Sequence, residues 1–178
     1  MHWQKIFQRA AIALIIFTAD ALLKAYVHLS IPVMHAASIY PYDGIGIFHD
    51  WHGIDFAITH VINKGAAWGV LASLQQYLLY ARILIIGGLL TYLFFIKAEP
   101  LRKLCLTLIA TGAIGNVVDY FVYGHVVDMF YFVLWGYSYP VFNIADCAIF
   151  CGIACLLLQS LLRKAKKGAS GKQKASQA

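Results

Sequence analysis

The stretch FNIADCAIFCGIACLLLQSLL, residues 142–162, combines a long apolar run with one acidic side chain near its start. About 20 apolar residues are needed to cross the hydrocarbon core of a bilayer, so this stretch is predicted to form a transmembrane helix. An ionisable side chain at the edge of a bilayer is costly and is therefore a functional candidate. Asp146 is for this reason the first residue to explain.

Three further segments of similar length and composition occur in the chain of 178 residues. Charged residues make up only 12% of the chain, about half the share found in soluble domains. The first segment is interrupted by Asp20 and Lys24 and lacks a clear cleavage site, so we expect it to be a helix rather than a removed signal peptide. The predicted fold is an integral membrane protein, mainly α, with four transmembrane helices at about 9–29, 77–96, 102–121 and 141–162.

The formal net charge of +6 is concentrated at the C-terminus. Residues 163–178 contain six cations and no anion, which predicts a disordered cytoplasmic tail that contacts membrane lipid and binds no nucleic acid. Residues 1–162 would then form a single membrane domain. Because cytoplasmic flanks are enriched in Lys and Arg, both termini are predicted to be cytoplasmic, and the flanking cations are Lys5, Arg9, Lys97, Arg102 and Lys103.

This orientation places the two longer connections, residues 30–76 and 122–140, on the outer face of the membrane. The run IDFAITHVI, residues 54–62, alternates as a strand does, and GHVVDMFYFVLW, residues 124–135, is rich in β-branched and aromatic residues. We therefore expect a small extracytoplasmic β-element at the membrane interface, where aromatic residues are favoured.

Asparagine and aspartate recur together at the outer ends of the last two predicted helices, as Asn116 with Asp119 and Asn143 with Asp146. Asn143 can be an N-cap with Asp146 at the third helical position, where the helix dipole favours a carboxylate. Dipole reasoning fails for Asp119, which is expected at a helix C-terminus. A site built from some pair of these aspartates and Asp128, with asparagines as hydrogen-bond donors, explains all five residues.

Paired carboxylates suggest a specific reaction. Two carboxylates in contact share one proton, because both cannot easily ionise. One can then take a proton from water while the other hydrogen-bonds to a substrate carbonyl oxygen, which hydrolyses an amide without metal, cofactor or covalent intermediate. The pKa values belong to the pair, so the spacing does not say which residue is the base.

Other polar residues leave two alternatives open. Asp20 and Lys24 lie one turn apart on one helix face, either as a structural ion pair or with Lys24 directed toward the outer site. A metal site could be assembled from one outer loop, but its spacing is loose and lacks a tight ligand pair, so we predict no metal there. Its candidate ligands are His49, Asp50, His52, Asp55 and His60.

A different class of function is a small proton-coupled carrier or channel subunit, in which Asp20 and Lys24 relay charge and the outer acids bind a cation. Such a relay requires acids at several depths, whereas this chain gathers five Asn and Asp positions at one edge. A noncatalytic assembly factor would leave these acids unexplained. We therefore favour a hydrolase.

Five motifs in this order resemble signal peptidase II, the prolipoprotein signal peptidase family of bacteria, over nearly the whole chain up to the tail. They are TADALLK (18–24), INKGAAWG (62–69), GNVVDY (115–120), GHVVDMF (124–130) and FNIADCAI (142–149). The chain departs from the family pattern at Tyr120, where arginine is usual, and at Trp68, where phenylalanine is usual. The first change removes a cation expected to pair with Asp119 or with a substrate carbonyl.

The resemblance implies an intramembrane aspartyl protease of the bacterial cytoplasmic (inner) membrane, with an outer β-cradle and no cofactor. Asp128 and Asp146 match the family's catalytic pair. The implied substrates are prolipoproteins whose lipobox cysteine carries diacylglycerol, cut immediately before that cysteine. Positions that match residues for substrate binding or dyad support are Asp20, Lys24, Asn63, Gly65, Asn116, Asp119 and Asn143.

Overall fold

The computed structural model describes residues 2–64 and 75–175, and the structural statements below concern these residues. Four helices in them have the length and apolar composition to cross a membrane. They are α1 (His2–Ser30), α2 (Gln75–Phe95), α3 (Pro100–Tyr123) and α4 (Ile144–Ala175). The predicted multi-pass, mainly α membrane fold is thus confirmed.

The helix ends differ from the predicted ones, most of all in α4. This helix begins at Ile144 rather than at 141, because Asn143 caps it. Its membrane-type span ends at Arg163, but the helix continues to Ala175, into the tail for which we expected disorder. Lys, Ala and Gln in this extension favour a helix, whereas Gly168 and Gly171 disfavour it. The division into a domain of residues 1–162 and a tail of 163–178 stays a prediction.

The predicted β-element is a four-stranded antiparallel sheet in the order β1-β2-β3-β4. The two strands expected from the sequence are β2 (Ile54–Asn63) and β3 (Val126–Leu134), and each has a hairpin partner that was not predicted, β1 (Ile45–Trp51) and β4 (Tyr137–Ser138). Both hairpins turn on an X-Gly pair with positive φ, the geometry that two-residue hairpin turns require.

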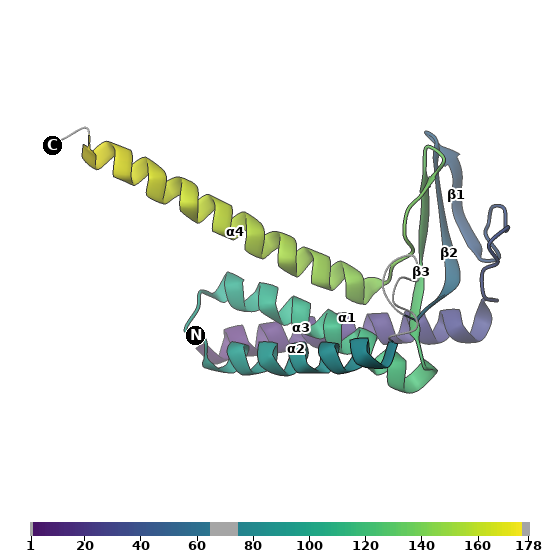
Figure 1. Cartoon of the computed structure of the whole chain (residues 1–178), viewed down its shortest axis with the longest axis horizontal. Coiled ribbons are helices and arrows are strands. Elements are labelled where there is room, and N and C mark those ends of the chain that lie inside the picture. The colour runs from purple at the N-terminus through teal and green to yellow at the C-terminus, as the bar shows by residue number, and fades with distance from the viewer. Residues whose placement is uncertain (1, 65–74, 176–178) are drawn as a thin grey trace.

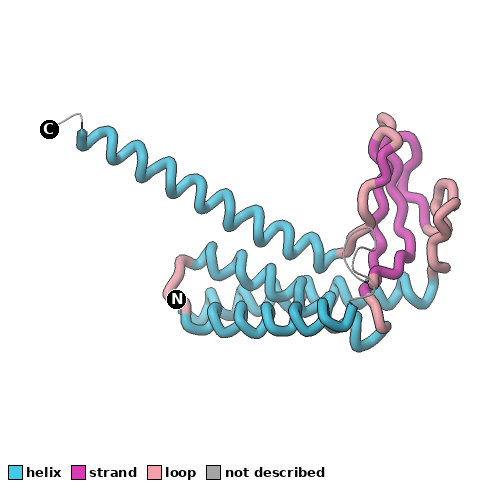
Figure 2. Tube along the Cα trace, in the orientation of Figure 1, coloured by secondary structure: helices cyan, strands magenta, loops and turns pink. Residues whose placement is uncertain are grey.

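The sheet stands at one end of the helices (Figure 1). The tube view shows the same division, with helix on one side and strand at the other end (Figure 2). Helix α3 contacts each of the other three helices, while α4 runs at an angle to α1 and α2. Helix α1 begins, and α4 ends, at the end remote from the sheet. The chain therefore reaches the sheet end twice, and both β segments meet there.

A small core joins the sheet to the helices. Val27 and Ile31 at the end of α1 pack against Val127 and Met129 of β3, and all four are at most 6% exposed. Burying these apolar side chains holds β3 against α1. Asp128 lies between the two buried β3 residues, so this core also fixes the position of its backbone.

Candidate active site

Asp128 in β3 is almost completely buried, with 2% of its surface exposed. Its Oδ1 accepts a hydrogen bond of 2.7 Å from Asn143 Nδ2, and its Oδ2 accepts one of 2.9 Å from Asn63 Nδ2. Asn63 ends β2, which pairs directly with β3, so the sheet register brings this amide to the acid. Burial of a carboxylate is tolerated when its oxygens are hydrogen-bonded in this way.

Asp146 lies in the first turn of α4 and forms a reciprocal cap with Asn143. The backbone N–H of Asp146 donates to Asn143 Oδ1 at 2.8 Å, and the backbone N–H of Asn143 donates to Asp146 Oδ2 at 3.3 Å. The capping interpretation is therefore confirmed. The remaining oxygen, Oδ1, accepts a hydrogen bond of 2.8 Å from Asn116 Nδ2, so Asp146 caps the helix and also belongs to a wider polar cluster.

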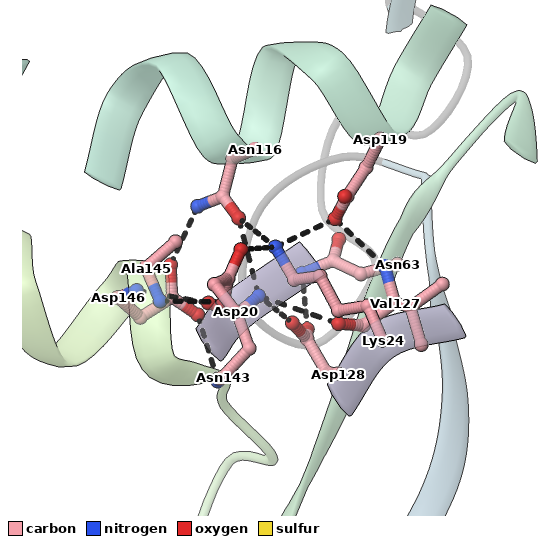
Figure 3. A network of polar contacts seen from close by, with 10 residues as sticks. All are labelled: Asp20, Lys24, Asn63, Asn116, Asp119, Val127, Asp128, Asn143, Ala145 and Asp146. Atoms are coloured by element: carbon pink, nitrogen blue, oxygen red, sulfur yellow. Dashed lines mark hydrogen bonds and ion pairs between the residues drawn. The ribbon is translucent and has the colours of Figure 1, made fainter. Parts of the chain in front are cut away.

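Asn143 connects the two acids, as Figure 3 shows. Its side chain has no exposed surface, and it donates to Asp128 while its backbone and Oδ1 hold Asp146. The side-chain amide of Asn143 donates through Nδ2 to Asp128 and accepts through Oδ1 from the backbone of Asp146. Because these two atoms are fixed relative to each other, the amide sets the distance between the two acidic residues.

Lys24 is the centre of the adjacent ionic cluster and has no exposed surface. Its Nζ lies 2.7 Å from Asp20 Oδ2 and 2.7 Å from Asp119 Oδ2, and it donates to Asn116 Oδ1 at 3.0 Å. The structural ion pair considered for Asp20 and Lys24 is present, and it is also part of the site, because Asn116 links Lys24 to Asp146 (Figure 3).

Asp20 additionally anchors the start of α4. Its Oδ1 accepts a hydrogen bond of 2.8 Å from the backbone N–H of Ala145, which is one of the unpaired amides at a helix N-terminus. Glycine at position 115 favours this approach, since a Cβ there would lie 3.0 Å from Asp20 Oδ2 and 3.4 Å from the Ala145 side chain, which would have to shift slightly. Gly115 therefore lets α1, α3 and α4 converge at the cluster.

Asp119 is fully organised despite the arginine missing at position 120. It is 4% exposed, pairs with Lys24 and accepts a hydrogen bond of 3.4 Å from the backbone N–H of Val127. Lys24 thus provides a cation beside Asp119, where the motif resemblance led us to expect an arginine at position 120. Tyr120 instead contacts the ring of Phe121.

The electrostatic environment of Asp128 favours its protonated form. Burial is the main cause that raises the pKa of Asp128 to about 7, with a further contribution from the negative charge of Asp146. The hydrogen bonds from Asn63 and Asn143, and the charge of Lys24, oppose this rise. The carboxyl group can therefore gain or lose a proton near neutral pH.

Both acids open onto one cavity of about 790 Å³. Its walls are mainly apolar and come from β3, the segment before α4, and α4 itself. Arg82 of α2 also lines the cavity and was missed in the sequence analysis. A single arginine within an apolar span is unusual, and this signal could have identified it. The apolar wall residues are Val126, Phe132, Leu134, Val141, Phe142 and Phe150.

Two motif positions lie outside the described residues, Gly65 and Trp68. The loop histidines do not assemble as the metal alternative required. His49 Nδ1 lies 2.8 Å from Asp55 Oδ1, and Asp55 also accepts a 2.7 Å hydrogen bond from the backbone of Asp50, which is the main cause that lowers the pKa of Asp55. His60 is buried elsewhere, at the base of the sheet.

Comparisons with known proteins identify the family of this chain. The family model for signal peptidase (SPase) II matches residues 12–162. A lipoprotein signal peptidase of Latilactobacillus sakei is 34% identical over 155 residues, which cover 86% of this chain and 93% of that protein. One of Chlamydia pneumoniae is 40% identical over 111 residues, which cover 61% of this chain and 66% of that protein.

A solved structure of a bacterial membrane enzyme is similar with a TM-score of 0.74 and 26% sequence identity, and it covers 91% of this chain and 92% of that chain. The family match, the relatives and this fold agree with the multi-pass membrane architecture. The chain therefore belongs to the signal peptidase II family of membrane proteases.

Proposed function

We propose that this chain is an aspartic endopeptidase that cuts diacylglyceryl-modified prolipoproteins immediately before the lipidated cysteine, with Asp128 and Asp146 as its catalytic pair. Membership of the signal peptidase II family supports signal-peptide cleavage. The observation that carries the residue assignment is that both carboxyl groups line one cavity and are joined through Asn143.

In the proposed reaction the pair holds one proton at neutral pH, which the raised pKa of Asp128 supports. The ionised carboxylate takes a proton from a water molecule, whose oxygen attacks the carbonyl carbon of the scissile peptide. The protonated carboxyl group donates its proton to the carbonyl oxygen. Collapse of the tetrahedral intermediate then breaks the C–N bond. The departing nitrogen receives the proton taken from water, and a hydroxyl proton of the intermediate returns to the carboxylate that had protonated the carbonyl oxygen.

The cavity suits the proposed substrate because an apolar signal peptide with acyl chains needs apolar walls. Phe132, Leu134 and Phe142 come from the sheet side of the cavity, and Phe150 comes from α4. The two acids lie at the sheet end of the helices. A scissile peptide bond bound there would be accessible in a substrate whose acyl chains lie in the adjacent leaflet.

The supporting residues have separate proposed roles. Asn63 and Asn143 hold Asp128, and Asn116 holds Asp146, through the hydrogen bonds described above. Asp20, Lys24 and Asp119 join the helices beneath the pair. Gly65 is proposed as a supporting residue only because it matches the motif INKGAAWG.

For location, we propose the bacterial inner membrane, with both termini in the cytoplasm and the active site near the outer face. The start of α1, the α2–α3 connection and the end of α4 lie at the end remote from the sheet, and this end carries the flanking cations. The basic tail would contact anionic lipid on the same side.

The test is cleavage of a lipidated prolipoprotein by the purified protein in detergent, comparing Asp128→Asn, Asp146→Asn and Asp119→Asn with wild type. We expect the first two to lose at least about 10³-fold in turnover, because each removes one partner of the proton exchange. Asp50→Asn is the matched control, since Asp50 is exposed in the outer sheet, and it should retain wild-type turnover.

Turnover near wild type in either Asp128→Asn or Asp146→Asn would reject the pair. If Asp119→Asn alone were inactive, the catalytic pair would have to be reassigned. Thermal unfolding of each variant, measured alongside, separates a catalytic loss from a loss of folded protein.

A further inference from the structure

Three histidines from distant parts of the sequence meet at the base of the sheet, away from the cavity. They are His28 in the last turn of α1, His60 in β2 and His125 between α3 and β3. One ring nitrogen from each lies within 4.8 Å of the others. The ring centroid of His28 is 5.5 Å from that of His60 and 6.0 Å from that of His125.

The position of His60 follows from an irregularity in β2. The pairing register with β3 shifts between Ile58 and Val61, and as a result Thr59 and His60 are both buried although they are adjacent in the strand. A β-bulge commonly redirects one side chain in this way. The backbone oxygen of His60 also accepts a 2.9 Å hydrogen bond from Met34, which fixes its place beside the end of α1.

The tautomer of His60 is determined by its partner. Its Nδ1 lies 2.9 Å from the backbone oxygen of Ile31, and a carbonyl oxygen can only accept, so Nδ1 carries the proton. Its Nε2 therefore has a free lone pair, is buried, and has no hydrogen-bond partner among the described residues. Metal-binding histidines characteristically donate their second ring N–H to a carbonyl or carboxylate in this manner.

His125 repeats this pattern. Its ring hydrogen-bonds to the backbone of Tyr123, while its Nε2 is buried and has no partner in the described part of the chain. Two buried, unpartnered imidazole nitrogens beside a third histidine are a costly arrangement that a bound cation would satisfy.

From this geometry we propose that His28, His60 and His125 bind one divalent transition-metal ion of the zinc class. Imidazole nitrogen suits Zn²⁺, Cu²⁺, Ni²⁺ and Co²⁺, whereas Mg²⁺ and Ca²⁺ require oxygen ligands that this cluster lacks among the described residues. Zn–N distances near 2.1 Å in a tetrahedral site bring ligand nitrogens to about 3.4 Å from each other. His28 is exposed and its ring packs against Tyr123 with centroids 4.6 Å apart, so closing the remaining distance requires a rotation of this side chain.

Such an ion would connect three elements that also carry the active-site cluster. His28 lies one turn after Lys24, His60 precedes Asn63 in β2, and His125 precedes Asp128. None of the three histidines lines the cavity. The ion would thus stabilise the junction of α1 with the sheet without taking part in peptide hydrolysis.

The experiment measures Zn²⁺ and Co²⁺ binding to the tag-free full chain in detergent after a chelator has been applied and removed. We expect one equivalent of Co²⁺ to bind with the visible absorption of a tetrahedral site, and Zn²⁺ to displace it and raise the thermal unfolding temperature. The variants are His28→Asn, His60→Asn and His125→Asn. Asparagine at position 60 can still donate to Ile31, so this variant removes the metal-binding nitrogen while keeping the other contact.

Each of these variants should weaken the binding of Co²⁺ and Zn²⁺ more than about 100-fold. Loss of a residue that only hydrogen-bonds to a metal ligand costs less than this. His52→Asn, an exposed histidine at the β1–β2 turn, is the matched control and should bind as wild type. His28→Asn is the decisive variant, because an exposed position does not endanger folding. Wild-type affinity in His28→Asn, or an equal loss in His52→Asn, would overturn the proposal, as would less than one equivalent bound by wild type.

Peptidase turnover gives a separate result. The chelated protein should cleave the lipidated substrate at the wild-type rate while its unfolding temperature is lower than that of the Zn²⁺-loaded protein. If chelation abolished turnover and Zn²⁺ restored it in wild type but not in His28→Asn, the structural role proposed for the ion would be wrong.

Discussion

The two groups of acids at the ends of the helices are held in different ways. Asp20 and Asp119 each lie 2.7 Å from the ammonium group of Lys24, whereas the hydrogen bonds described for Asp128 come from amide groups. An ion pair favours the charged carboxylate, but an amide donor does so more weakly, and burial then raises the pKa. The partners therefore differ: the ion-paired acids join α1 to α3 through Lys24, whereas Asp128 is held by amides at the wall of the cavity.

The largest expected effect is on the ion-paired group. Lys24→Met keeps the length of the side chain but leaves Asp20 and Asp119 buried without their cation, and breaking a buried pair costs about 3–5 kcal/mol. We expect a corresponding loss in the free energy of unfolding, measured with denaturant in detergent. Lys97→Met, at an exposed position, should leave stability unchanged.

A second change tests the origin of that loss. Adding Asp20→Asn and Asp119→Asn to Lys24→Met removes the uncompensated charges and should restore part of the stability. If the triple variant were less stable than Lys24→Met alone, charge burial would not be the cause.

Asn143 joins the amide-held acid to the cap of α4, so its removal should affect catalysis and stability together. Asn143→Ala takes away the 2.7 Å hydrogen bond to Asp128 and the cap on Asp146, and we expect about 1–3 kcal/mol of lost stability and about 100-fold lower turnover. Gln76→Ala on the exposed face of α2 is the control. Unchanged turnover in Asn143→Ala would mean that the acids keep their positions without this amide.

The pH dependence should distinguish Asp128 from an ordinary aspartate. Its folded-state pKa of about 7 lies above the unfolded value near 4, so its contribution to stability is full below pH 4 and is lost as the pH rises through 7. The unfolding temperature of wild type relative to Asp128→Asn should therefore fall between about pH 4 and 7 and level off above. A flat difference over this range would contradict the raised pKa.

The smallest expected effect concerns the arginine that the family usually has. Because Lys24 already pairs with Asp119, Tyr120→Arg should change the free energy of unfolding and the activation free energy by no more than about 0.5 kcal/mol. Thermal unfolding and cleavage assays measure both. A large gain in turnover would show that Lys24 does not replace that arginine.

Much of the architecture could be predicted because its signals are local. The apolar lengths identified four helices, alternation identified β2, β-branched and aromatic composition identified β3, and the Asn143–Asp146 spacing identified the cap. The order of the motifs also predicted that Asp128 and Asp146 form the catalytic pair. Arg82 was missed although an arginine within an apolar span is itself a signal, because the sequence does not show that α2 borders the cavity.

Contacts between distant segments could not be predicted in the same way. The Lys24–Asn116 hydrogen bond joins residues 92 apart, and the Ala145–Asp20 hydrogen bond joins residues 125 apart. The histidines show the same limit. His49, His52 and His60 are close in the sequence, but His60 lies instead beside His28 and His125, which belong to other segments.

Residue order alone fixes properties that depend on a few neighbours along the chain, namely helix length, strand alternation, the cap of α4 and the presence of costly acids near the membrane edge. Tertiary structure decides which acid has an ammonium partner and which has amides, because that depends on how α1, α3, α4 and the sheet converge. Desolvation and the identity of the hydrogen-bond donor set the protonation of a buried carboxyl group, and both are products of packing.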